Sequence, residues 1–293
     1  MIGTYYRVLD KGFLALKDVM GDDSSIEEAA RVSYQKGTRK ISDTRNLIRY
    51  LMRRGHSSPF EQVEFKFHVK LPIFVARQWI RHRTASVNEI SGRYSELKTE
   101  YYLPSQDNYN LQSTTNKQGR SDELITGEVY GEMVKCIGAV REEVTELYDR
   151  LLGQGVAREL ARIDLPLSIY TEWYWKCDLR NIFNFLKLRL DTHAQKEIRD
   201  YANVMAAIVR ERCPLAYEAF EDYVLNSKTF TATEVRLLQL PQDRVSPKSW
   251  LKEKGYSDRE TEEYLTKLDN HTIVVQPLHT FPVFIPEELN GKT

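Results

Sequence analysis

The chain has 293 residues, enough for one large domain or two of ordinary size, and its 41% hydrophobic and 29% charged content is typical of a globular protein. Its 42 basic and 42 acidic residues give a formal net charge of zero, which argues against a surface built to coat nucleic acid or an anionic membrane. No apolar run approaches the roughly 20 residues that span a bilayer, and residues 1–10 show no secretory signal, so we expect a soluble, cytoplasmic protein with no membrane partner.

Two helices are predicted near the N-terminus. Ser25 and Glu28 have capping-box spacing ahead of an alanine-rich turn, so we expect a helix to begin near Ser25. Residues 43–54 place apolar side chains on one helical face, and Gly55 follows at a position where glycine ends helices. The polar stretch 56–59 is expected to be a loop.

A strand and a third helix are predicted next. Apolar and polar residues alternate over 63–69, which is the period of a half-buried strand. Pro72 suits the first turn of a helix that we expect to run to about His82. Residues 83–94 are polar and contain Gly92, which indicates a loop.

The middle of the chain combines a polar insertion with a long helix. Residues 105–121 are rich in Gln, Asn, Ser and Thr and have no apolar period, so we expect a mobile insertion. Apolar residues recur every three or four positions over 122–152, which predicts a helix. Alternation over 167–175 predicts a second strand, and Asp178 is placed to cap a helix that runs to Leu190.

The remaining predicted elements are helices, and they are followed by a C-terminal segment that is interrupted by prolines. Thr192 and Gln195 form a second capping-box candidate, at the start of a helix that we expect to end near Cys213. Residues 215–226 predict a short amphipathic helix. Prolines interrupt residues 227–293, which we interpret as an appendage to the core.

The three cysteines are Cys136, Cys177 and Cys213. They lie far apart and form no CxxC pair, so a disulfide framework or a structural metal site is not expected. None has an adjacent basic cluster that would lower its pKa, and we interpret all three as structural thiols.

A dense basic cluster spans residues 77–93, where four arginines accompany one carboxylate, Glu89. Arg77 and Arg81 share a face if this segment is helical. Like charges at this spacing repel unless an anion lies among them, and guanidinium groups together with hydroxyls suit phosphate. The alternative is a set of solvated arginines that form surface ion pairs with Glu89.

Residues 81–94 fit the pattern RHRxxSxNExSxRY and resemble the flavin-dependent thymidylate synthases at nine fixed positions. Four further segments resemble that family in the same order: Gly55–Glu61, Ala161–Leu167, Asn184–Arg189 and Asp191–Gln195. The resemblance covers about residues 20–226, which implies a catalytic domain over 1–226 and a C-terminal extension of unknown role over 227–293.

The resemblance implies reductive methylation of deoxyuridine monophosphate (dUMP) to thymidine monophosphate (dTMP). Methylenetetrahydrofolate would donate the carbon, FAD reduced by NADPH would carry the hydride, and no cysteine nucleophile would take part. The implied fold is α+β, a curved antiparallel sheet packed with long helices. The implied partners are dUMP, folate, NADPH and further copies of the chain in a homotetramer with active sites between subunits, with no nucleic acid.

The resemblance also implies roles for individual residues, with Arg189 as the catalytic group that polarises the uracil ring. The implied dUMP contacts are Gln78, Arg81, Glu89, Ser91, Gly92, Arg93, Arg162 and Arg189. The implied FAD contacts are His56, Ser58, Arg81, His82, Arg83, Glu89, Asp178, Arg180 and Asn184. No metal is implied.

Two positions depart from the family pattern: Asp178 stands where a neutral amide is expected, and Gln62 stands where histidine is frequent. Two alternative functions remain open from sequence alone. One is an RNA- or nucleotide-binding protein that uses the arginines electrostatically, although the zero net charge argues against it. The other is a relative that binds nucleotide and flavin without turnover.

Overall fold

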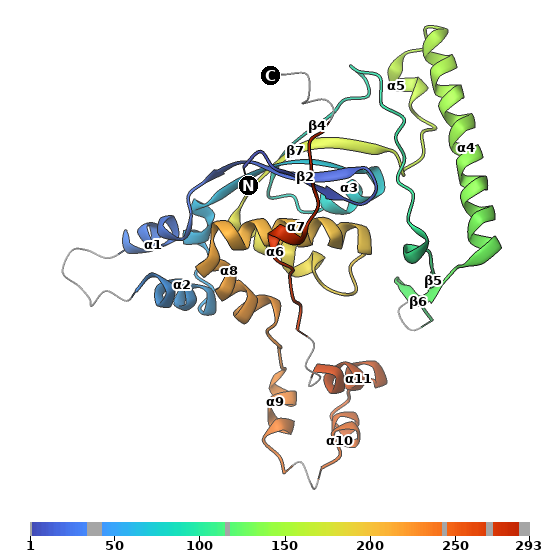
Figure 1. The fold of residues 1–293 in the computed structure, drawn as a ribbon. Helices are drawn as coiled ribbons and strands as arrows, with labels where there is room; N and C mark the ends of the chain where they lie inside the picture. Colours follow the sequence, from blue (N-terminus) through green and yellow to red (C-terminus); the bar gives the residue numbers. More distant parts are fainter. Residues whose placement is uncertain (1, 34–42, 115–117, 242–244, 268–271, 287–293) are drawn as a thin grey trace.

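The structure, a computed structural model, describes residues 2–33, 43–114, 118–241, 245–267 and 272–286. Its main feature is an antiparallel six-stranded sheet in the order β4-β7-β3-β2-β1-β8, with helices packed beneath it (Figure 1). The strands are β1 Tyr5–Val8, β2 Gly12–Met20, β3 Glu64–Pro72, β4 Ser86–Glu89, β7 Tyr170–Asp178 and β8 Val283–Phe284. The α+β fold class expected from the sequence is confirmed.

The two central strands show why alternation predicted them. Phe65, Phe67 and Val69 of β3 are fully buried on the face toward the helices. On the neighbouring β7, Trp173 and Trp175 are buried on the same face, and the register pairs Phe67 with Trp175. Large apolar side chains at every second position of these strands therefore form the sheet side of the main core.

Helices that are far apart in the sequence cover this face of the sheet (Figure 1). The helices are α1 Asp23–Arg31, α2 Thr44–Arg53, α3 Ile73–Trp79, α6 Leu179–Arg189, α7 Lys196–Arg212 and α8 Pro214–Phe220. α7 is the most deeply buried, with Tyr201, Met205 and Ile208 inaccessible to solvent. Trp79 of α3 packs edge-on against Trp173 and Trp175, which places the end of α3 firmly on the sheet.

The N-terminal part of the chain differs from the sequence-based expectation. Strands β1 and β2 form a hairpin that the sequence analysis did not predict. Helix α1 is capped by Asp22, whose side chain accepts from the backbone of Ser24, while Ser25 completes a reciprocal capping box. The helix therefore begins at Asp23, two residues before the expected start near Ser25, because Asp22 is the N-cap. α2 follows its prediction, with Asp43 as its cap.

The region from α3 to β4 also contains a correction. α3 ends at Trp79, about a turn before the expected end at His82. The predicted loop 83–94 contains the strand β4, which pairs with β7 from Ser86↔Lys176 to Glu89↔Trp173. The polar segment forms a strand because β7 supplies the hydrogen bonds, and this pairing partner is remote in the sequence.

The polar insertion contains ordered elements. A short strand β5 Asn110–Gln112 pairs with β6 Arg120–Leu124, a strand pair that the polar composition of 105–121 did not predict. The long helix α4 Gly127–Gly153 begins later than the expected residue 122 because β6 occupies that position. The short helix α5 Arg158–Ala161 follows it.

The start of α7 was also predicted with the wrong cap. Gln195 is the residue before the helix, and its side chain makes no capping bond. It bonds instead to Gln78 of α3. The side chain of Gln195 therefore joins α7 to α3 and does not cap α7.

The C-terminal extension consists of two parts. Helices α9 Ala232–Leu238, α10 Pro247–Glu253 and α11 Asp258–Lys267 project beyond the main helices and share a small core of Leu237, Leu251 and Tyr264 (Figure 1). Residues 272–286 then return to the main body, where Val275 and Leu278 join the main core and β8 pairs with β1. No helix within the described ranges has both the length and the apolar character needed to cross a membrane.

Candidate functional site

The end of α3 meets the end of α6 at Arg189. The guanidinium Nε of Arg189 donates to Nε2 of His82 at 3.0 Å, and its Nη2 donates to the backbone carbonyl of Gln78 at 3.3 Å. Arg189 forms no ion pair with any described acidic residue, and burial lowers its pKa. A half-buried cation with no counter-charge is favoured only if an anion or an electron-rich group binds next to it.

His82 is neutral in this arrangement. Burial, followed by the charge of Arg189, lowers the pKa of His82 from 6.5 to about 4. The same conclusion follows from geometry, because a guanidinium can only donate and Nε2 must therefore carry a lone pair. The ring of Phe185 lies against the imidazole edge, with centroids 4.9 Å apart, and limits its movement. His82 thus serves as a fixed acceptor that orients Arg189.

A second group of predicted residues lies in the loop after β4. Gly92 is buried, and a Cβ added there would lie 2.9 Å from Cδ1 of Leu97 and 3.1 Å from Cδ of Arg162. The loop backbone therefore approaches Arg162 as closely as only glycine allows. The hydroxyl of Ser91 accepts from the backbone N–H of Arg93, and the side chain of Arg93 pairs with Glu159 at 2.9 Å. Ser91, Gly92, Arg93 and Arg162 are thus brought together.

Glu89 of β4 makes a specific contact that the sequence did not reveal. Its Oε1 accepts a 2.5 Å hydrogen bond from the hydroxyl of Thr171 on β7. No described arginine pairs with Glu89, so the alternative of surface arginines neutralised by this carboxylate is not supported.

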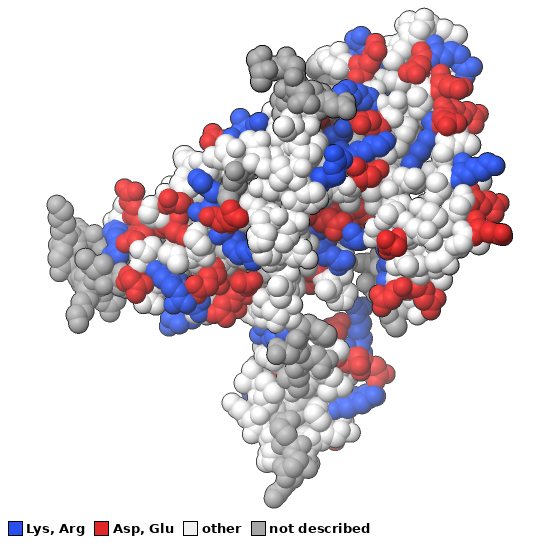
Figure 2. Space-filling model, in the orientation of Figure 1, with Lys and Arg blue, Asp and Glu red and all other residues white. Residues whose placement is uncertain are grey.

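The arginines at the end of α3 are free of acidic neighbours. Among the described residues, Arg77, Arg81 and Arg83 have no carboxylate within ion-pair distance, and all three are exposed. Elsewhere, Lys and Arg are interspersed with Asp and Glu over the face shown in Figure 2. An unpaired basic group at one edge of a molecule with no net charge favours binding of an anion at that edge.

The N-terminal end of α6 carries a third group. Asp178 caps the helix: its carboxylate accepts from the backbone N–H of Asn181 at 3.0 Å and from its amide at 2.7 Å. Arg180 pairs with Glu61 at 2.5 Å, and Asn184 lies one turn further along the exposed side. Arg180 and Arg189 are at opposite ends of α6, roughly 14 Å apart along the axis. The departure at Asp178 therefore supplies a helix cap.

A fourth group lines a cavity of about 600 Å³ between α1, α2 and the segment 56–62. His56, Ser58 and Gln62 are at its wall, and the ring of Tyr50 packs edge-on against His56 at 5.8 Å. This cavity thus brings together two predicted FAD contacts and the second position that departs from the family pattern.

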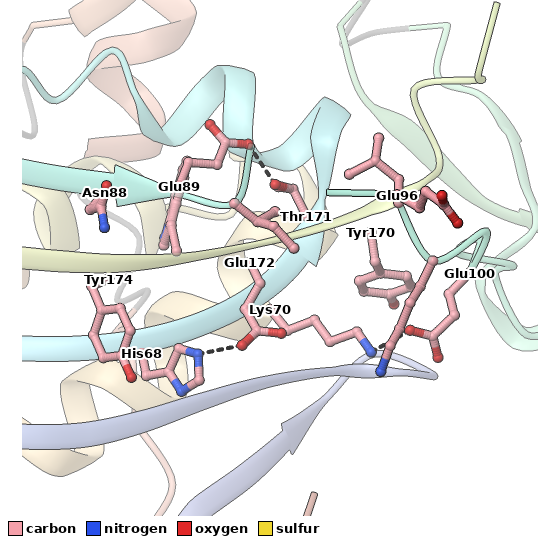
Figure 3. Close-up of a pocket in the computed structure, with 14 residues that line it drawn as sticks. His68, Lys70, Asn88, Glu89, Glu96, Glu100, Tyr170, Thr171, Glu172 and Tyr174 are labelled. Atoms are coloured by element: carbon pink, nitrogen blue, oxygen red, sulfur yellow. Dashed lines mark hydrogen bonds and ion pairs between the residues drawn. The ribbon is translucent and has the colours of Figure 1, made fainter. Parts of the chain in front are cut away.

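A hollow of about 420 Å³ lies on the other face of the sheet, away from the helices (Figure 3). Its polar wall includes the contact of His68 with Glu172 and the ion pair of Lys70 with Glu100, both at 2.5 Å. Glu89 is the one predicted site residue that reaches it. Four glutamates, Glu89, Glu96, Glu100 and Glu172, line this hollow, which makes it less suited to an anion than the arginine groups are.

Two of the three cysteines are buried in the core, and the third lies on the surface. Cys177 and Cys213 are buried, and burial raises the pKa of both thiols. The Sγ of Cys177 donates to the carbonyl of Thr84 at 3.3 Å. Cys136 is exposed on α4. Within the described ranges, no group of three His, Cys, Asp or Glu side chains is placed to hold a metal ion.

Most of the predicted residues therefore form four groups in one chain: Gln78, His82 and Arg189 at the α3–α6 junction; the 91–93 loop with Arg162; the start of α6; and the 56–62 cavity. The remaining three are Arg81 and Arg83, which follow α3, and Glu89 on β4. Sequence reasoning missed the contributions of Gln195 and Thr171. Gln195 could have been found, because it lies inside one of the segments that resembled the family, whereas Thr171 is brought to Glu89 only by strand pairing.

Comparison with known proteins gives a consistent result. The family model described as Thymidylate synthase complementing protein matches residues 15–215. The chain is 54% identical over 234 residues to the flavin-dependent thymidylate synthase of Treponema denticola, covering 80% of this chain and 88% of that protein. It is 48% identical over 276 residues to the enzyme of the same name from Gluconobacter oxydans, covering 92% of this chain and 89% of that one.

Among solved structures, the chain is similar to the UMP/dUMP methylase PolB from Streptomyces cacaoi. In its complex with 5-Br dUMP that protein has a TM-score of 0.66 at 33% identity, covering 75% of this chain and 98% of PolB. The complex with 5-Br UMP gives a TM-score of 0.64 at 34% identity, with the same coverage.

Proposed function

Because this chain belongs to the family of flavin-dependent thymidylate synthases, we propose that it methylates dUMP to dTMP with methylenetetrahydrofolate as carbon donor and NADPH as reductant. The balanced reaction consumes dUMP, methylenetetrahydrofolate, NADPH and one proton, and yields dTMP, tetrahydrofolate and NADP⁺. The observation that carries the proposal is the half-buried guanidinium of Arg189, which forms no ion pair with any acidic residue that the structure describes and is oriented by a neutral histidine.

Arg189 is the proposed catalytic residue. C5 of uracil is a poor nucleophile, and negative charge develops on the ring as its electron density increases during reaction. A fixed cation that is already desolvated stabilises this charge without reorganising at the moment of reaction. Its two hydrogen bonds, to Nε2 of His82 and to the carbonyl of Gln78, leave its Nη1 for a pyrimidine oxygen.

The loop 91–93 and Arg162 are proposed to hold the phosphate and sugar of dUMP. The guanidinium groups of Arg93 and Arg162, the hydroxyl of Ser91 and the backbone N–H groups of the loop provide the donors that phosphate oxygens need, and Gly92 lets the loop lie close to Arg162. The pairing of Arg93 with Glu159 is between two exposed side chains, so a dianionic phosphate can replace the carboxylate at small cost. Gln78 and Arg81 complete the proposed set, together with Glu89, which accepts from a ligand hydroxyl or N–H.

FAD fits the remaining groups chemically. Its pyrophosphate needs cations, and Arg81 and Arg83 are basic residues with no described acidic neighbour. Ser58 and His56 line a cavity large enough for part of a dinucleotide. Arg180 and Asn184 at the start of α6 are the other proposed contacts, with His82, Glu89 and Asp178. When bound and reduced by NADPH, the flavin would supply the hydride that converts the transferred carbon to a methyl group.

No cysteine nucleophile is included in the proposed reaction. A thiolate at C6 would need a low thiol pKa and access to the base. Cys177 and Cys213 have neither, because burial both raises the pKa and blocks approach. Electrostatic activation by Arg189 takes the place of covalent activation.

Assembly with further copies of the chain is part of the proposal. Helix α4 is 27 residues long, yet only Tyr148 is buried in it, and apolar Val129 and Val140 are exposed. A helix of this length with an uncovered apolar face is favoured when it packs on another subunit. Because one chain holds four separate groups of site residues, a homotetramer can bring complementary groups together at each active site.

The direct test is a complete assay of the purified protein loaded with FAD. We expect dTMP to form only when dUMP, methylenetetrahydrofolate and NADPH are all present, with NADPH oxidation stimulated by dUMP. A flavin-loaded, folded protein that forms no dTMP from the full set would overturn the proposal and support a binding protein without turnover.

A further inference from the structure

Glu197, in the first turn of α7, is a buried carboxylate with partners from three parts of the chain. Only 1% of its surface is exposed. Its Oε1 accepts from the guanidinium Nη2 of Arg120 on the hairpin strand β6, and from the hydroxyl of Tyr102 at 3.1 Å. Its Oε2 has no hydrogen-bond partner among the described residues. Such a group is energetically costly, so its presence calls for a role.

The carboxylate is ionised despite its burial. Burial alone would raise the pKa of Glu197, but the hydrogen bond and the charge of Arg120 outweigh it and the pKa is lowered. Burial, followed by the charge of Glu197, raises the pKa of Tyr102, which therefore stays a donor. The ion pair depends on the insertion hairpin, because Arg120 is its cation.

Gln195 connects this ion pair to the α3–α6 junction. Gln195 stands two residues before Glu197 at the start of α7, so the contacts that anchor Glu197 also hold the backbone from which Gln195 projects. Its Oε1 accepts from the side-chain amide of Gln78. The backbone carbonyl of Gln78 in turn accepts from Arg189. The start of α7 thus links the hairpin, through the anchored Glu197 and its near neighbour Gln195, to the side chain and backbone of Gln78.

A purely stabilising role explains this arrangement poorly. A buried ion pair gains little over an apolar pair of the same shape, because desolvation offsets most of the attraction. The amide of Gln195 makes no helix cap, although a residue at this position commonly does. It faces Gln78 instead, where a shift of about an ångström would misplace a side chain that is proposed to bind the nucleotide.

We propose that Glu197, held by Arg120 of the β5–β6 hairpin, is a positioning residue that acts through Gln195 to fix Gln78 for nucleotide binding. The polar insertion then has a function: it supplies the cation that keeps a buried carboxylate charged beside the site. This inference rests on the proposed function, because the ligand that it positions for is dUMP.

Four variants test it: Arg120→Ala, Arg120→Lys, Gln195→Ala and the double variant Arg120→Ala with Gln195→Ala. Arg120→Ala and Gln195→Ala are each expected to raise the KM for dUMP about tenfold, with kcat within about twofold and flavin content unchanged. Arg120→Lys should recover most of the loss, since it restores the positive charge. Arg259→Ala, which removes an exposed cation of α11, is the matched control and should leave KM unchanged.

The double variant shows whether Arg120 and Gln195 act on dUMP binding through the same contacts or independently of each other. If the contacts act in series, its KM rises no further than that of the more damaged single variant. Multiplied effects, or an unchanged KM in folded single variants, would overturn the inference. A merely structural role predicts lower thermal stability and flavin content with the KM for dUMP unaltered.

Two measurements distinguish the positioning role from the proposed function: dTMP formation by the unaltered protein and dUMP binding by the variants. If the unaltered protein makes dTMP but the variants bind dUMP normally, the positioning role alone is refuted. If the unaltered protein makes no dTMP, the proposed function fails first. Should Arg120→Ala not fold, Gln195→Ala decides the matter, because it leaves the ion pair of Arg120 and Glu197 intact.

Discussion

Arg189 donates from Nε to Nε2 of His82 over 3.0 Å, so the imidazole is held as the neutral tautomer with its proton on Nδ1. The hydrogen bond therefore fixes the protonation of the histidine and the orientation of the arginine. The histidine cannot act as an acid through Nε2 while the bond is made, and the guanidinium is oriented by an acceptor that carries no charge. A carboxylate in that place would neutralise the cation and weaken its action on a substrate.

Replacement of Arg189 by alanine is expected to lower turnover by at least about a hundredfold, which is the scale of losing a fixed electrostatic contact to a developing charge. Flavin should still bind, because the arginines proposed to hold its phosphates remain. The measurements are dTMP formation and the visible flavin spectrum. Lys187→Ala removes an exposed cation two residues earlier on α6 and serves as the control. Colourless Arg189→Ala protein would contradict this assignment.

Arg93→Ala should weaken dUMP binding by about 1–3 kcal/mol, as expected for a lost charge-assisted hydrogen bond. Glu159→Gln is the matched variant, because it removes the carboxylate that pairs with Arg93 at 2.9 Å while leaving the guanidinium in place. Since that carboxylate competes with the ligand, Glu159→Gln should bind dUMP as well as or better than the unaltered protein. Titration calorimetry measures both, and an equal loss in the two variants would refute the placement of the phosphate beside Arg93.

The low pKa of His82 predicts a loss of stability in mild acid. The folded protein holds the imidazole neutral down to about pH 4, whereas the unfolded chain takes up a proton near pH 6.5. Between these values the unfolded state binds more protons, so the free energy of unfolding decreases as the pH falls from 6.5 to 4. The contribution is about 1–3 kcal/mol after allowance for partial solvent access.

Denaturant unfolding at pH 7 and pH 4.5 measures this effect. His82→Gln should show a smaller decrease than the unaltered protein. His279→Gln changes an exposed histidine far from the α3–α6 junction and should leave the decrease unaltered. An identical pH profile for all three proteins would refute the assignment to His82.

Cysteine replacements should separate stability from activity. Cys177→Ala and Cys213→Ala are each expected to lower the free energy of unfolding by roughly 1–2 kcal/mol, because both side chains are buried. Turnover of the folded variants should be retained within a few-fold, because the proposed reaction uses no thiolate. Cys136→Ser, on the exposed side of α4, should change neither property. Complete loss of activity in any one folded variant would require a covalent role for that thiol.

Local patterns predicted the elements that depend on local interactions. The alternation of β3 and the Asp178 cap of α6 are properties of short segments, and both are present. β4 could not be predicted in the same way, because Ser86–Glu89 has little apolar content and becomes a strand by pairing with β7. The start of α1 was misplaced because two adjacent segments each offer a capping pattern, and only packing selects Asp22.

The resemblance named individual site residues, but the sequence did not predict the contacts between them. Spacing placed Arg77 and Arg81 near one another, yet it carries no information on which acids lie nearby. The contacts of Glu89 with Thr171 and of Gln78 with Gln195 join residues about a hundred positions apart, and they follow from the sheet register and from the docking of α7. Such contacts require the tertiary structure.

The pairing of β8 with β1 also affects how the protein is made. Tyr5 lies opposite Phe284, and the guanidinium of Arg7 sits over the ring of Phe284 at 4.4 Å. During translation, β1 leaves the ribosome long before its neighbour is synthesised, and its free edge can pair with strands of other nascent chains. We therefore expect the yield of native protein to depend on chaperones and expression rate, and chains interrupted before residue 283 to aggregate.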